Sequence, residues 1–304
     1  MNKIPVVFHP SYDVSSESSS RVPLGKYIDL KELLKFKGII STQNLFIPTA
    51  LSSKNIKITH EYSYVERVAL GTLSDSEKRI IGLPSINRFC KRAFIASSGT
   101  LLATRLAIKS GLVAANLAGG SHHASTSAGS GFCIFNDVAV ALNCLLVEGL
   151  ISNAIVLDLD VHQGDGTAEI FSNNNRVFTV SVHCEKNFPT KKIKSDLDLG
   201  LEVGTSDEFY LKKLKKILQE IMYIPADILI YNAGVDIHED DYLGFLKVSK
   251  AGITARENLV LDFVKKRKLP LVITLGGGYQ KNIAKLSELH SIIFEETLSR
   301  FKLN

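Results

Sequence analysis

Short apolar runs alternate along the chain with segments in which apolar residues recur every three or four positions. The short runs are rich in β-branched residues and almost continuously apolar, which is typical of strands buried on both faces of a parallel sheet. The pattern predicts six strands, at residues 5–8, 111–118, 153–160, 176–182, 226–234 and 269–277.

Helices are predicted between these strands, over residues 97–111, 136–149 and 205–221. The last begins with Thr205 and Glu208 at the spacing of a capping box, and its apolar positions 211, 214, 218 and 221 form a buried stripe. Gly111 is placed to end the first helix. Strands alternating with helices favour a doubly wound α/β fold, in which ligands bind beyond the carboxyl ends of the strands.

Chain length and net charge say little about the number of domains or the class of binding partner. The chain has 304 residues, which fits one large α/β domain or two small ones. Its net charge of +5 comes from scattered Lys and Arg residues, with short clusters at 191–194, 212–216 and 265–268. Such clusters are more often solvated faces than nucleic-acid sites, so we expect no direct binding of nucleic acid.

Cysteine spacing and apolar run length bear on the compartment. No C-x-x-C pair occurs among Cys90, Cys133, Cys144 and Cys184. The first residues lack the long apolar stretch of a secretory signal, and no apolar run reaches the roughly 18 residues of a membrane span. We therefore expect a cytoplasmic protein with free thiols and no membrane span. The sequence leaves the oligomeric state open.

Histidines and aspartates follow the predicted strands at the points where the strands end. Five of the eight histidines lie between positions 122 and 238. Polar side chains at one edge of several strands are typical of a functional site rather than of packing. The candidates are His122, His123, Asp158, Asp160, His162, Asp165, His183, Asp236 and Tyr279.

Three of these residues predict a metal site. Asp160 and His162 are two residues apart, so their side chains point the same way on an extended segment, and Asp236 follows another strand. Two carboxylates and one imidazole suit a divalent ion with an open coordination position. Zinc is favoured, and Fe(II), Mn(II) or Co(II) would also be accepted. An N-capping aspartate and a hydrogen-bonded histidine would explain the Asp-x-His pair alone, but not the third residue.

The adjacent pair His122 and His123 suggests acid–base chemistry. Asp158 and Asp165 are available as partners, and a carboxylate on an imidazole Nδ1–H fixes the tautomer and raises the basicity. One histidine would take a proton from water and the other would give one to the leaving group. We expect the pKa values of the two histidines to differ, because their environments differ.

Tyr279 follows three glycines. Glycines let the backbone approach a ligand closely, so the tyrosine hydroxyl could polarise a carbonyl opposite the metal. A tyrosine that merely caps a loop is the alternative interpretation.

Four motifs together resemble the zinc-dependent histone deacetylase and acetylpolyamine amidohydrolase family of the arginase–deacetylase superfamily. They read HHA…GFCIFNDVAVA, DLDVHQGDGT, NAGVDIHEDD and LGGGYQK. The resemblance covers most of the chain and is nearest to the class IV, histone deacetylase 11-like group. It implies a single catalytic domain over residues 1–304, with a mainly parallel sheet of about eight strands and helices on both faces. It also implies removal of an acyl group, acetyl or long-chain fatty acyl, from the ε-amine of lysine in proteins.

The resemblance assigns roles to the matching positions. The metal, zinc or less commonly Fe2+, would be held by Asp160, His162 and Asp236. The catalytic group would comprise His122 with Asp158, His123 with Asp165, and Tyr279. The acyl-lysine channel would be lined by Gly131 and Phe132, with its opposite wall supplied by Phe188 or Asn187. A structural monovalent cation, usually K+, would be held by Asp158, Asp160, His162, Ser181 and Val182.

Departures from the family pattern keep alternatives open. The segment GGSHHA lacks the proline of the class I pattern, Asp165 stands where class IV has asparagine, and no acidic rim residue can be placed. An acetylpolyamine or small-amide amidohydrolase is the main alternative. A ureohydrolase would need a second metal, but His238 stands where another aspartate is wanted. A non-catalytic acyl-lysine binding protein would have lost Tyr279 or a metal ligand, and none is lost.

Overall fold

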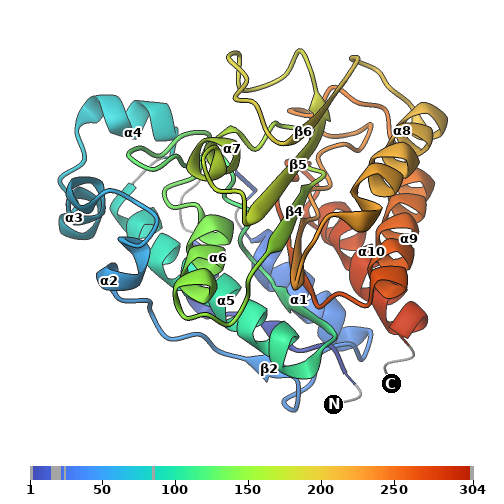
Figure 1. The fold of residues 1–304 in the computed structure, drawn as a ribbon, viewed down its shortest axis with the longest axis horizontal. Helices are drawn as coiled ribbons and strands as arrows, with labels where there is room; N and C mark the ends of the chain where they lie inside the picture. Colours follow the sequence, from blue (N-terminus) through green and yellow to red (C-terminus); the bar gives the residue numbers. More distant parts are fainter. Residues whose placement is uncertain (1–2, 15–21, 24, 84–85, 302–304) are drawn as a thin grey trace.

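The predicted strands assemble into one parallel sheet in the computed structural model, which describes residues 3–14, 22–23, 25–83 and 86–301 (Figure 1). The strand order is β2-β1-β3-β8-β7-β4-β5-β6, and every neighbouring pair is parallel. The strands are β1 (Val6–Val7), β2 (Leu45–Phe46), β3 (Val113–Asn116), β4 (Ala154–Asp158), β5 (Val177–Cys184), β6 (Leu197–Leu201), β7 (Ile228–Asn232) and β8 (Leu271–Thr274).

All six predicted strands are present, most of them shorter than predicted, and two further strands were missed. β2 has only two residues, which is too short to give a pattern. β6 reads LDLGL, and its first four residues alternate between half-buried and exposed positions before the buried Leu201, because it lies at the edge of the sheet. A prediction built on continuous apolar runs detects the buried interior strands and passes over such an edge strand.

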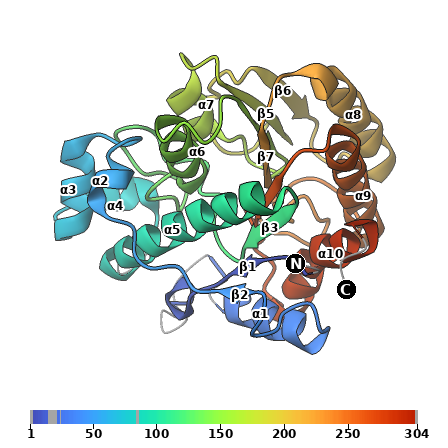
Figure 2. The same cartoon turned by 60° about the horizontal axis from the view of Figure 1, so that its bottom comes forward.

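Helices cover both faces of the sheet, as predicted (Figure 2). The α-helices are α1 (Lys26–Phe36), α2 (Ser53–Ile56), α3 (Tyr62–Leu70), α4 (Asp75–Ile81), α5 (Ile86–Ser110), α6 (Asp137–Val147), α7 (Asp165–Phe171), α8 (Asp207–Glu220), α9 (Lys250–Arg267) and α10 (Ile283–Phe301). Within the described residues, short 3-10 helices occupy Pro10–Tyr12 and Ile221–Tyr223.

The sheet has a hydrophobic core on each face. In β4, Ile155 and Leu157 pack into the cluster that includes α1, α8, α9 and α10. The alternate residues Ala154 and Val156 pack into the cluster that includes α3, α5 and α6. Successive strand residues point to opposite faces, so burial of both faces explains why the interior strands are apolar throughout.

The starts of α5 and α8 differ from the prediction. α5 begins at Ile86 rather than at residue 97, and it ends as predicted before Gly111, whose φ of +67° suits glycine. The predicted capping box of α8 is wrong. Ser206 is the N-cap, and the Thr205 hydroxyl instead donates to the Glu202 carbonyl at 2.7 Å.

The parallel arrangement brings the carboxyl ends of the strands to one edge of the sheet. The four central strands β3, β8, β7 and β4 are consecutive neighbours. The segments that follow them carry the predicted histidines, aspartates and Tyr279. Loops far apart in sequence therefore meet above the middle of the sheet, as in other doubly wound folds.

The helices and the cysteines can be compared with the sequence-based expectations. None of the helices within the described residues combines the length and apolarity needed to cross a membrane. All four cysteines are buried free thiols.

Candidate active site

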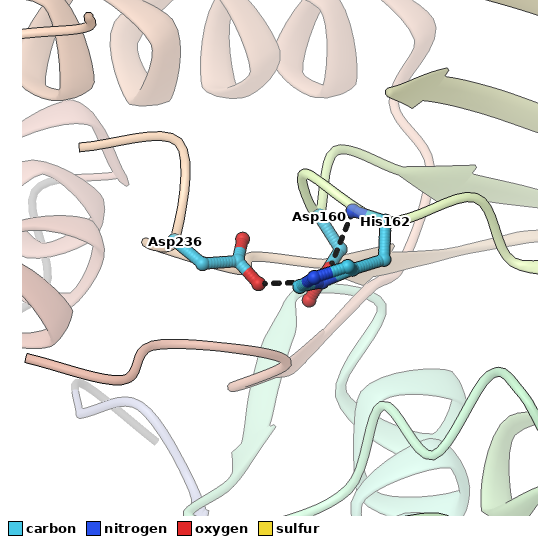
Figure 3. A group of neighbouring side chains, drawn as sticks. All are labelled: Asp160, His162 and Asp236. Atoms are coloured by element: carbon cyan, nitrogen blue, oxygen red, sulfur yellow. Dashed lines mark hydrogen bonds and ion pairs between the residues drawn. The ribbon is translucent and has the colours of Figure 1, made fainter. Parts of the chain in front are cut away.

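Three predicted metal ligands converge at the carboxyl ends of β4 and β7 (Figure 3). The His162 Nδ1 atom lies 3.0 Å from Asp160 Oδ1 and 3.2 Å from Asp236 Oδ2. One ligand atom from each of the three buried residues lies within 4.8 Å of the others. Because β4 and β7 are hydrogen-bonded neighbours, the segments that carry the two carboxylates leave the sheet side by side.

Backbone donors fix the outer oxygen of each carboxylate. The Gly277 N–H donates to Asp160 Oδ2 at 2.6 Å, and the Val161 N–H donates to Asp236 Oδ1 at 2.9 Å. The remaining oxygen of each carboxylate faces His162. Such orientation by surrounding hydrogen bonds is a general feature of metal ligands.

The electrostatics of this cluster favour a positive charge between the three side chains. Burial and the nearby charge of Asp160 raise the pKa of Asp236 to about 7. Burial lowers the pKa of His162, but its bonds to Asp160 and Asp236 outweigh this effect and raise the pKa to about 10. Two buried carboxylates and an imidazole nitrogen aimed at one point are a donor set that fits a divalent cation.

A glycine makes room for this donor set. A Cβ atom on Gly277 would overlap Asp236 Oδ2 and lie 2.7 Å from Asp160 Oδ2. The backbone at Gly277 must therefore approach the carboxylates more closely than any side chain allows. Gly277 of the GGGY segment is therefore required by its close contact with the carboxylates, not by the geometry of a turn.

The adjacent histidines each form the predicted pair with an aspartate. His122 Nδ1 lies 2.6 Å from Asp158 Oδ2, and His123 Nδ1 lies 2.6 Å from Asp165 Oδ1. Asp158 is the last residue of β4, and Asp165 is the first residue of α7. The amide of Asn232 also donates to Asp158 Oδ1 at 3.0 Å, a contact that sequence reasoning missed.

The pKa values of the two histidines were expected to differ, and they are shifted in opposite directions. Burial lowers the pKa of His122, but the carboxylates of Asp158 and Asp160 outweigh it and raise the pKa to about 9. Burial and the nearby His122 lower the pKa of His123 to about 4. Near neutral pH the pair therefore combines a protonated His122 with a neutral His123.

Tyr279 forms a wall of the same site. Its ring centroid lies 6.0 Å from that of His162 and 6.0 Å from that of Phe132. The Tyr279 N–H donates to Asp241 Oδ2 at 2.6 Å, and this carboxylate also accepts from the Leu243 N–H. Asp241 belongs to the HEDD segment, but its contact with Tyr279 could not be read from the sequence.

Sequence comparison with known proteins identifies the family of this chain. A family model described as the histone deacetylase domain matches residues 20–293. The chain belongs to the histone deacetylase family. An uncharacterized protein of Picosynechococcus is 42% identical over 290 residues, covering 95% of this chain and 96% of the relative. Histone deacetylase 2 of Arabidopsis thaliana is 27% identical over 299 residues, covering 94% and 77%.

A solved structure supports the fold of this histone deacetylase family member. The crystal structure of the HDA15 HD domain superposes with a TM-score of 0.80 and covers 98% of this chain and 89% of its own. The sequence identity is 18%, so this likeness speaks for the fold alone. It agrees with the predicted parallel sheet of about eight strands flanked by helices.

The residues predicted to line the acyl-lysine channel of this deacetylase-family site lie beside the histidines. The ring of Phe188 meets that of His123 edge-on at 4.7 Å. A Cβ atom on Gly131 would lie 2.5 Å from His123 and 2.9 Å from Phe188. Asn187 turns away, and its amide donates to the carbonyls of Leu243 and Gly244 at 2.7 and 2.6 Å. Of the two candidates for the opposite wall, Phe188 is therefore the one next to the site.

A small cavity of about 60 Å³ adjoins the site of this histone deacetylase relative. It is lined by both histidines, Phe132 and Tyr279, and also by Lys26 and Arg92. Sequence reasoning missed these two cations, because each is one of several basic residues in its helix and nothing local marks the one that lines the cavity. The predicted monovalent-cation site stays a prediction, although Ser181 does lie opposite Asp158 in the β4–β5 register.

We expect removal of a metal ligand to remove the metal without unfolding the protein. Asp236→Asn or His162→Ala should contain no zinc by metal analysis after purification. Zinc at 100 times its dissociation constant should stabilise the wild type by about 2.7 kcal/mol over the metal-free protein, and should leave both variants unchanged. Full zinc content in either variant would refute the assigned ligands.

Gly277→Ala should disturb the same carboxylates through steric overlap. We expect at least about 10-fold weaker zinc binding in chelator competition, because the oxygens held by Gly277 must move. Gly149→Ala is the matched control, since Gly149 has a positive φ of +69° but no neighbour that a Cβ would meet. It should lose stability while keeping its zinc affinity. Equal zinc affinities in the two variants would contradict the role of contact at Gly277.

Proposed function

We propose that this histone deacetylase family member is a metal-dependent hydrolase that removes acyl groups from the ε-amine of lysine. The observation that carries the proposal is the meeting of three elements at one sheet edge. These elements are the Asp160–His162–Asp236 cluster, two histidine–aspartate pairs and a tyrosine. General acid–base catalysis and oxyanion stabilisation both require such convergence.

The metal would be held by Asp160, His162 and Asp236. A zinc ion bound there would supply Lewis acidity toward the water and the acyl carbonyl. The carboxylate-rich ligand set would also accept Fe(II), so the native metal is part of what must be measured.

The protein groups divide the proton transfers between them. His123, neutral near pH 7, takes a proton from the attacking water while Asp165 fixes its tautomer. The Tyr279 hydroxyl donates to the oxygen that becomes negative as water adds to the carbonyl carbon. His122, held protonated by Asp158, stabilises that charge. A histidine then protonates the amine, the C–N bond breaks, and a carboxylate and a free lysine leave.

The dimensions of the site support short acyl groups. Gly131, Phe132 and Phe188 would enclose the aliphatic stem of the lysine. Beyond them, the cavity of about 60 Å³ is far below the roughly 300–1,000 Å³ of pockets that hold drug-sized ligands. Lys26 and Arg92 also make part of its lining cationic, which suits a small carboxylate better than a long alkyl chain. We therefore favour acetyl over long fatty-acyl substrates.

Acetylated polyamines or other small amides are the second candidate, because the same chemistry would act on them. A ureohydrolase is disfavoured. Among the residues that the structure describes, Asp160, His162 and Asp236 are the one group of histidine, cysteine and acidic side chains found suitable for a metal ion. A purely binding role is disfavoured because the sequence has lost neither Tyr279 nor a metal ligand.

The proposal is tested with a panel of acyl-lysine peptides, from acetyl to myristoyl, incubated with zinc-loaded protein. We expect turnover of acetyl-lysine and a steep fall in kcat/KM as the acyl chain lengthens. Asp236→Asn, which should hold no zinc, is the control for contaminating activity. Turnover of long chains alone would refute the preference for short acyl groups. Turnover of acetylpolyamines but no peptide would replace lysine as the substrate.

Loss of the Tyr279 hydroxyl should slow catalysis without disturbing the fold. Tyr279→Phe is expected to lower kcat by about 10²–10³-fold, the usual effect of removing one oxyanion donor, with zinc content unchanged. Tyr62→Phe, at an exposed tyrosine of α3, is the matched control and should behave as the wild type. An unchanged kcat in Tyr279→Phe would reassign that tyrosine to a structural role.

A further inference from the structure

Arg256 is the largest fully buried side chain among the described residues, and the proposed chemistry makes no use of it. It lies in α9, within the core on one face of the sheet, and is 0% exposed. A buried guanidinium is costly unless it is paired and hydrogen-bonded. The partners that stabilise it therefore indicate what it does.

The guanidinium contacts both backbone segments that carry the metal-binding carboxylates. Its Nη1 donates to the Gly234 carbonyl at 2.5 Å and makes a longer contact of 3.5 Å with the Leu159 carbonyl. Leu159 directly precedes Asp160, and Gly234 lies two residues before Asp236. One cation thus spans the exits of β4 and β7.

Glu257 supplies the countercharge and keeps the guanidinium in place. Arg256 Nη2 lies 2.5 Å from Glu257 Oε1, and the Tyr231 hydroxyl donates to Glu257 Oε2 at 2.6 Å. Tyr231 belongs to β7, so the ion pair is anchored on the same strand whose exit it holds. Glu257 is itself 1% exposed, which shields the pair from water.

The segments that carry the Gly234 and Leu159 carbonyls pack directly against the metal-binding carboxylates. A Cβ atom on Gly234 would lie 2.6 Å from Asp160 Oδ2, so the backbone at Gly234 rests directly against that carboxylate. The Val161 N–H donates to Asp236 Oδ1, which interlocks the two segments from the other side. A shift at either carbonyl would therefore change the separation of Asp160 and Asp236.

We propose that Arg256 is a positioning residue that fixes the separation of the two metal-binding carboxylates before the metal arrives. This inference rests on the metal site of the proposed function, but not on the identity of the substrate. Arg256 acts through the carbonyls of Leu159 and Gly234 and does not touch the ligands' carboxylates. Its loss should weaken metal binding and alter the coordination geometry, beyond any general loss of stability.

The test compares Arg256→Met with Arg267→Met. Arg267 lies in the same helix and likewise donates to two backbone carbonyls, those of Ile221 and Ile224, at 3.0 and 2.7 Å. Zinc affinity is measured by chelator competition, coordination by the absorption spectrum of the cobalt-loaded protein, and stability by thermal unfolding of the metal-free protein. We expect Arg256→Met to bind zinc about 10–100-fold more weakly with a changed cobalt spectrum, and Arg267→Met to lose stability alone.

Two further variants keep the test decisive. Arg256→Met/Glu257→Gln removes both charges and serves if Arg256→Met alone fails to fold. Arg256→Lys keeps one donor and should recover part of the zinc affinity. Wild-type zinc affinity and an unchanged cobalt spectrum in the double variant would overturn the proposal. If the wild type hydrolyses no acyl-lysine, the proposed function fails, but these metal measurements still decide the role of Arg256.

Discussion

The site is organised around two carboxylates that are buried side by side. Asp160 and Asp236 follow neighbouring parallel strands, so both arrive at the same edge of the sheet. Two adjacent negative charges with little access to water repel each other strongly. His162 and the backbone N–H groups that donate to the outer carboxylate oxygens offset this repulsion. The two carboxylates also leave room for a cation between them.

The same buried charges shift the pKa values of the two histidines in opposite directions. His122 is close to Asp158 and Asp160 and is held protonated, whereas His123 lies beside that positive charge and is held neutral. The adjacent positions in sequence place the two imidazoles 4.1 Å apart between ring centroids. A single pair of neighbouring residues thus supplies groups of opposite protonation state, which would separate the proposed acid and base roles without a second catalytic segment.

The sequence was sufficient for the parts of the structure that repeat a local pattern. Interior strands are apolar on both faces, and parallel strands align their carboxyl ends. The convergence of His122, Asp160 and Asp236 could therefore be predicted from strand ends alone. The edge strand β6 and the early start of α5 could not, because their packing partners lie elsewhere in the fold. The capping box of α8 was wrong because the Thr205 hydroxyl bonds back to Glu202 instead.

Residues that act through tertiary contacts left no local signal. Lys26 and Arg92 line the cavity from helices whose sequences resemble any solvated helix. Arg256 sits in an ordinary helical segment, and nothing in its neighbourhood in sequence indicates that it meets two strand exits. Asp241 could be seen as one acid among several, but its bond to the Tyr279 backbone depends on the meeting of two loops.

The amide of Asn187 has a consequence for how specificity can change. By binding the carbonyls of Leu243 and Gly244, it ties the segment that carries Phe188 to an outer loop bearing the exposed Tyr242 and Phe245. The segment of Phe188, which forms the proposed channel wall, and this outer loop are therefore expected to move together. Substitutions in the loop can move the wall without touching the substrate. For the proposed acyl-lysine channel, chain-length preference is therefore expected to depend also on residues outside the channel.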